Sequence, residues 1–107
     1  MKVEVLFVAE CPSHPEAVKL VRDVLSAQGV SAEIHEVLVA DERMANELRF
    51  PGSPTIRIDG RDVAGESSRA HNFALSCRLY AGSKVVGLPP AEMIHHAVRE
   101  ARRGERR

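Results

Sequence analysis

The pattern of apolar and polar positions divides the first half of the chain into a strand, a helix and a second strand. Residues 3–9 form a nearly continuous apolar run rich in valine, which is typical of a central strand covered on both faces. After a turn that contains two prolines, apolar side chains recur at helical spacing over residues 17–25, and Gly29 is positioned to end this helix. Residues 30–39 then alternate as a second strand. A strand, a helix and a strand in this order imply parallel strands joined by a right-handed crossover.

The middle of the chain predicts a short helix followed by a hairpin. Asp41 is a suitable N-cap for a helix in which Met44 and Leu48 share one face. Residues 55–59 alternate strictly between polar and apolar side chains, and the Asp59-Gly60 pair is a strong hairpin signal. We therefore expect an antiparallel pair of strands to join the parallel pair.

The last third of the chain completes the predicted order of elements. Residues 64–74 are polar and aperiodic, which indicates an irregular insertion, and residues 75–80 alternate as a fourth strand. Two prolines at residues 89–90 precede a last amphipathic helix, which we expect Gly104 to end. The order βαβαββα predicts an α/β fold, with a four-stranded mixed sheet and helices on both of its faces.

Length and charge limit the classes of protein to which the chain can belong. Its 107 residues suit one domain, which we place at residues 1–103 with a frayed basic tail at residues 104–107. Fifteen basic residues balance fifteen acidic ones, which argues against disorder and against a nucleic-acid interface over the whole domain. No run approaches the roughly 20 apolar residues of a bilayer span, and the first apolar run is too short for an export signal. We expect a soluble cytoplasmic protein with no membrane or nucleic-acid partner.

Cys11 is the strongest candidate for a chemically reactive residue. It lies where the first strand ends and the first helix begins, and the free N–H groups and positive dipole end of a helix favour an anion such as a thiolate. His14 follows three residues later and, when protonated, would lower the pKa of the thiol further. Pro12 fixes the turn between strand and helix. The simpler interpretation is that Cys11 is a small apolar residue at the end of a strand.

Three segments carry a resemblance to a known family. Cys11-Pro12-Ser13-His14 resembles the Cys-Pro-x-Cys turn of the thioredoxin and glutaredoxin superfamily, and Gly52-Ser53-Pro54-Thr55 resembles its cis-proline segment. Val86-Gly87-Leu88-Pro89-Pro90 is similar to the glycine-containing segment before its last helix. Residues 50–63 and 76–80 also look like small bacterial thioredoxin-like proteins. Together with the order of elements, the resemblance covers nearly the whole chain and implies a thioredoxin-like fold.

The resemblance implies a site built around one thiol. Cys11 would be the nucleophile and His14 would tune its ionisation. Pro54 would be in cis, so that the Ser53 backbone offers a substrate an exposed, extended edge. The residues that would position the substrate are Pro12, Ser13, Ser53, Pro54 and Thr55.

The sequence departs from the family where the second active-site cysteine would stand, because His14 occupies that position. A mixed disulfide at Cys11 must then be released by an external thiol such as glutathione, or by Cys77, or Cys11 has no redox role. Cys77 shares its alternation with two leucines and is expected in the core. Its pairing with Cys11 would require the insertion to rearrange the edge of the sheet.

A metal site is a weaker interpretation of the same residues. Cys11 and His14 have a C-x-x-H spacing, but structural zinc sites usually have a second pair of ligands, and the chain has none. His95 and His96 are adjacent on a helix and cannot chelate from one face. An iron–sulfur cluster, as in some monothiol glutaredoxins, is disfavoured because the turn lacks their Gly-Phe-Ser. We expect no metal and no resident cofactor.

Two hypotheses from different classes follow. The first is a monothiol thiol–disulfide oxidoreductase that uses Cys11 on a protein or low-molecular-weight thiol or disulfide, with glutathione or another small thiol as co-substrate. The alternative is a non-catalytic thioredoxin-like module that docks a protein or small ligand at the exposed Ser53-Pro54 edge.

Overall fold

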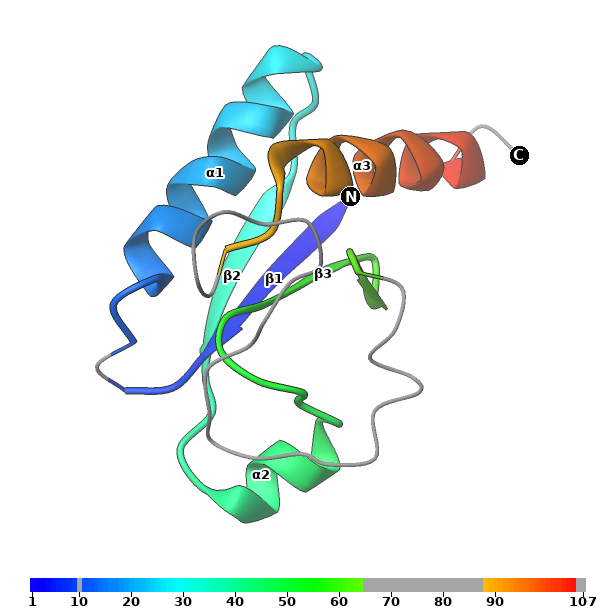
Figure 1. The fold of residues 1–107 in the computed structure, drawn as a ribbon. Helices are drawn as coiled ribbons and strands as arrows, with labels where there is room; N and C mark the ends of the chain where they lie inside the picture. The colour runs from blue at the N-terminus through cyan, green and yellow to red at the C-terminus, as the bar shows by residue number, and fades with distance from the viewer. Residues whose placement is uncertain (10, 65–87, 106–107) are drawn as a thin grey trace.

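The computed structural model describes residues 1–9, 11–64 and 88–105, and in them strands and helices follow the predicted order (Figure 1). The elements are β1 (Lys2–Phe7), α1 (His14–Ala27), β2 (Glu33–Leu38), α2 (Glu42–Glu47), β3 (Thr55–Ile58), β4 (Arg61–Asp62) and α3 (Ala91–Glu105). The prediction of an α/β protein with a four-stranded mixed sheet is confirmed.

The sheet has the strand order β2-β1-β3-β4, with β1 in its centre. β1 and β2 are parallel, whereas β3 is antiparallel to β1 and to β4. Asp59 and Gly60 form the turn between β3 and β4 with φ angles of 50° and 84°, as the Asp-Gly signal predicted. The strand that pairs with β3 is therefore Arg61–Asp62, directly after the turn. The predicted strand at 75–80 and all but Ala64 of the predicted insertion lie outside the described residues.

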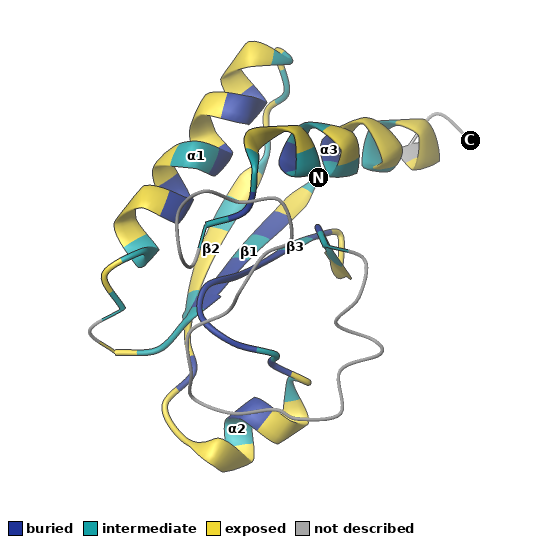
Figure 2. Cartoon of the chain, in the orientation of Figure 1, coloured by how far each residue is buried: buried dark blue, intermediate teal, exposed yellow. Residues whose placement is uncertain are grey.

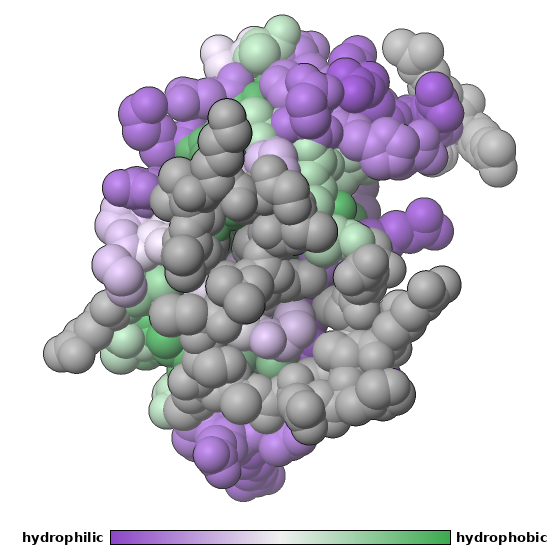
Figure 3. Space-filling model, viewed as in Figure 1, coloured by the Kyte–Doolittle hydropathy of each residue, from purple (hydrophilic) through white to green (hydrophobic). Residues whose placement is uncertain are grey.

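The core is divided between the two faces of the sheet. Val3 and Val5 of β1 pack on one face against α1 and α3, while Leu6 packs on the other face near α2. In Figure 2 the ribbon segments coloured as buried lie in the strands and on one side of each helix, while exposed positions lie on the other side. In Figure 3 the outer sides of α2 and α3 are hydrophilic, as expected for amphipathic helices on a sheet. Among the described residues, no helix has the length and apolar character needed to cross a membrane.

Both α1 and α2 end in the left-handed backbone conformation that completes a Schellman motif. Gly29 takes this position after α1 with φ 65°, as predicted. Arg49 takes it after α2 with φ 53°, where glycine is the usual residue. The N–H of Phe50 then donates to the Ala45 carbonyl at 2.8 Å. Arg57 of β3 donates to the Leu48 carbonyl at 2.6 Å, so the end of α2 is attached to the sheet.

The N-terminus of α2 depends on Asp41, whose carboxylate accepts a hydrogen bond from the Met44 N–H at 2.8 Å. Asp41→Ala should lower the free energy of unfolding by about 1 kcal/mol, because an N–H at the start of the helix loses its partner. Asp41→Asn keeps an acceptor and should retain most of this stability. Urea denaturation of both variants measures the difference, and equal midpoints for Ala and Asn would contradict the assigned role of the cap.

The last helix begins where the prolines predicted, but the prediction of its end was wrong. α3 begins at Ala91 and continues through Gly104 to Glu105. Gly104 keeps a helical conformation, since a glycine in a helix costs only about 1 kcal/mol relative to alanine. Arg102 and Arg103 lie in the last turn of α3, where positive side chains favour the helix dipole.

Candidate functional site

Cys11 lies in two consecutive turns between β1 and α1. Its N–H donates to the Val8 carbonyl at 3.3 Å, and its own carbonyl accepts from the His14 N–H at 3.3 Å. The N-cap of α1 is Ser13, so Cys11 stands just before the first helical turn instead of within it. Cys11 is a free cysteine, and the residue as a whole is half-buried.

His14 is engaged with β1 and β2. Its ring stacks on Phe7 with ring centroids 3.7 Å apart and an interplanar angle of 2°. Its Nε2 lies 2.6 Å from Oε1 of Glu36. Within the described part of the chain, Cys11 Sγ makes no hydrogen bond, and Nε2 of His14 contacts Glu36 instead of the thiol. His14 instead attaches the start of α1 to the sheet.

Sequence reasoning missed Phe7 and Glu36 as neighbours of His14. The register of the parallel pair places Glu36 beside Val5, and Val5 shares a face of the sheet with Phe7. Because α1 packs on that same face, the first residue of the helix comes over both side chains. The alternation of the two strands places Phe7 and Glu36 on the face covered by α1. Their proximity to His14 can be inferred only once the register of the strands is known.

The Ser53-Pro54 segment lies beside the Cys11 turn. The Ser53 hydroxyl accepts a hydrogen bond from the Val8 N–H at 3.1 Å, while the Val8 carbonyl accepts from the Cys11 N–H. One residue, Val8, thus holds both segments. The peptide bond between Ser53 and Pro54 is cis, as the resemblance implied.

The expectation that this segment offers an exposed edge was wrong. Ser53 is 1% exposed and Thr55 is fully buried, as is Pro54. The polar side chains tolerate burial because each has an internal partner: Ser53 bonds to Val8, and the Thr55 hydroxyl donates to the Gly52 carbonyl at 2.6 Å. A substrate strand therefore cannot pair with this segment as it stands. The accessible part of the site is the turn, in which Pro12 is exposed and Ser13 and His14 are half-buried.

A metal centre finds no support in the geometry of the described residues. No group of three histidine, cysteine or acidic side chains lies close enough there to hold an ion. His35 is 3.2 Å from Glu33, and His95 Nδ1 is 3.0 Å from Gln28 Nε2. Cys77, which the sequence suggested as a second thiol, lies outside the described residues.

Comparison with known proteins does not assign the chain to a family: no family model, no curated protein and no solved structure matches it.

Proposed function

We propose that the chain has a thioredoxin-like fold and acts as a monothiol thiol–disulfide oxidoreductase with Cys11 as its nucleophile. The strand order β2-β1-β3-β4 and the cysteine at the end of the central strand support this assignment. The observation that carries the proposal is the shared attachment at Val8, whose N–H bonds to Ser53 and whose carbonyl bonds to Cys11. It holds the backbone of the turn that carries Cys11 close to the serine-proline segment, which supports the arrangement that the Cys-Pro turn suggested.

The reaction needs one protein thiol and one external thiol. The Cys11 thiolate attacks a glutathionylated substrate, a new sulfur–sulfur bond forms to glutathione, and the substrate leaves as a thiolate that takes up a proton. A second glutathione thiolate then attacks the mixed disulfide, which releases Cys11 and forms glutathione disulfide. In the net exchange one glutathione thiol is consumed: its sulfur forms the disulfide bond of glutathione disulfide, the disulfide bond of the substrate breaks, and the proton of the glutathione thiol is taken up by the released substrate thiolate.

The burial of residues 53–55 favours small thiols and flexible glutathionylated side chains as substrates. An extended peptide would need an open strand edge, and this segment provides none. The role of His14 in this proposal is to hold the turn in place through Phe7 and Glu36. We place the reaction in the cytoplasm, where thiols stay reduced.

The direct test is formation of a mixed disulfide with glutathione disulfide, followed by mass spectrometry of the intact chain and of its peptides. We expect one glutathione per chain, attached at Cys11, in the wild-type protein and in Cys77→Ser. Cys11→Ser should take up none at that turn. An adduct confined to Cys77, or no adduct at any concentration of glutathione disulfide, would contradict the proposal.

The alternative, a binding module that docks partners at the Ser53-Pro54 edge, loses its docking surface because both residues are buried. The partly exposed turn that carries the free cysteine Cys11 remains, and it supports the chemical role.

A further inference from the structure

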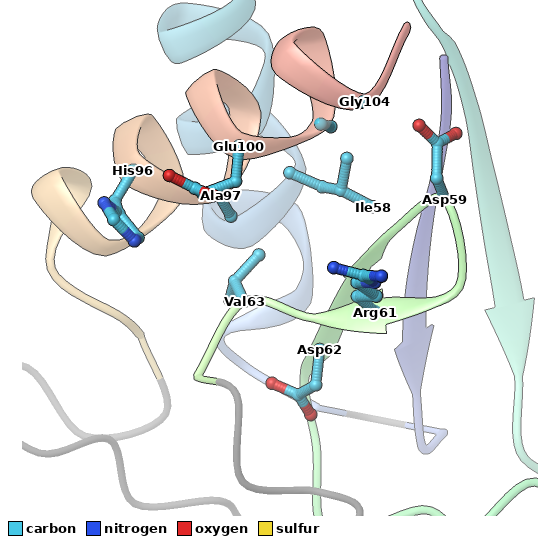
Figure 4. A pocket seen from close by; sticks show the side chains of 10 residues that line it. Ile58, Asp59, Arg61, Asp62, Val63, His96, Ala97, Glu100 and Gly104 are labelled. Atoms are coloured by element: carbon cyan, nitrogen blue, oxygen red, sulfur yellow. The ribbon is translucent and has the colours of Figure 1, made fainter. Parts of the chain in front are cut away.

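A pocket of about 470 Å³ lies between α3 and the β3–β4 hairpin (Figure 4). Its apolar lining consists of Ile58, Val63, Ala97 and Ala101. The pocket is far from Cys11 along the sheet: Asp59 at its rim accepts from the Lys2 N–H at the start of β1, whereas Cys11 follows the end of that strand. Any ligand bound here would therefore leave the Cys11 turn free.

Two basic residues, Arg61 and His96, line the pocket. Arg61 pairs in register with Ile58, so its side chain lies on the α3 side of the sheet, and in Figure 4 it extends into the space bordered by Ile58 and Val63. Within the described part of the chain, neither Arg61 nor His96 makes a side-chain hydrogen bond or an ion pair. Arg61 is exposed, and an arginine beside an apolar surface without a carboxylate partner is able to bind an anion in two parallel hydrogen bonds.

The negative groups at the rim already have partners. Asp62 pairs in register with Arg57, so its carboxylate, which accepts from the Ala64 N–H at 2.8 Å, lies on the other face of the sheet from Arg61 (Figure 4). Asp59 accepts from the Lys2 N–H, and Glu100 lies 3.1 Å from Arg103. They are therefore poor ligands for a cation, but they still repel a second negative charge. The pocket thus combines one free guanidinium, an apolar lining and a rim that disfavours polyanions.

We propose that this pocket binds a small organic acid with one carboxylate and an apolar body. The carboxylate pairs with Arg61, with His96 as a second polar neighbour, and the hydrocarbon part lies against the four apolar side chains. The volume is within the range of small-molecule sites, about 300–1,000 Å³. Phosphorylated metabolites and nucleotides are disfavoured because they bring two or more charges to a pocket whose lining also includes the acidic residues Asp59 and Glu100.

The test uses the full chain and two probes of equal length and opposite charge, octanoate and octylammonium, below their micelle-forming concentrations. Backbone amide NMR shifts follow the titration. Octanoate should produce saturable shifts at residues 58–63 and 97–104, and octylammonium should not. Equal or tighter binding of octylammonium, or octanoate shifts confined to other parts of the chain, would overturn the proposal.

Two variants distinguish the contribution of the Arg61 charge to octanoate affinity from the contribution of the apolar lining. Arg61→Gln should weaken octanoate binding at least about tenfold, because a charge-assisted pair is lost, while Arg43→Gln on the exposed side of α2 should leave it unchanged. Ala97→Leu should also weaken octanoate binding by filling the lining without removing a charge. Unchanged affinity in Arg61→Gln, or an equal loss in Arg43→Gln, would show that the guanidinium does not hold the ligand.

Discussion

Phe50→Ala should lower the free energy of unfolding by about 3–5 kcal/mol, the usual cost of removing a fully buried phenylalanine. Phe50 has no exposed surface and packs with Leu6, Val39 and Ala45 on the α2 side of the sheet. These four buried side chains form the centre of the cluster on that face, and partly buried Met44 and Leu48 pack against them, so the cavity left by the ring would be enclosed by apolar side chains. Chemical denaturation followed by circular dichroism measures the change.

Leu38→Ala is the matched control. Leu38 is a large apolar residue like Phe50, but it lies at the end of β2 and is 46% exposed. We expect this substitution to cost less than about 1 kcal/mol. The loss in the free energy of unfolding for Phe50→Leu should lie between the losses for Phe50→Ala and Leu38→Ala. Equal losses in Phe50→Ala and Leu38→Ala would mean that Phe50 does not form the centre of this cluster.

The fold was largely predictable because its signals are local. The valine-rich run of β1, the helical spacing that ends at Gly29, the Asp41 cap and the Asp-Gly turn each depend on neighbours within a few residues. Gly104 misled the prediction because a glycine signals the end of a helix only when the backbone turns left-handed there. In α3 it remains helical.

The site was predictable only in part because its contacts are between distant segments. The sequence placed Cys11 at the end of β1 and Ser53 before β3, but the bond that attaches Ser53 to Val8 joins residues 45 positions apart. That bond allows Ser53 to be buried, which no pattern of polar residues indicates. In the same way, the partner of His14 is Glu36, 22 positions away, and the choice between Glu36 and the thiol depends on strand register.

Cys11→Ser should lower the turnover of a glutathionylated peptide roughly 10³-fold or more, to the rate of the uncatalysed exchange. A serine hydroxyl cannot form the sulfur–sulfur bond of the mixed disulfide, so every later step is lost. Because the residue is half-buried and its thiol makes no hydrogen bond within the described residues, the exchange of sulfur for oxygen should leave the thermal midpoint nearly unchanged. Cys77→Ser provides the matched control and should keep its turnover.

The dependence of turnover on glutathione distinguishes the two routes by which the mixed disulfide can break. With one thiol in the turn, an external thiol must release Cys11, so the rate should rise with glutathione concentration and fall to zero without it. If Cys77 releases Cys11 instead, the first turnover should proceed without glutathione and Cys77→Ser should abolish it. Full turnover in Cys11→Ser would show that Cys11 is not the nucleophile. The reaction proposed for the turn would then be excluded, while the fold and the pocket at Arg61 would not be affected.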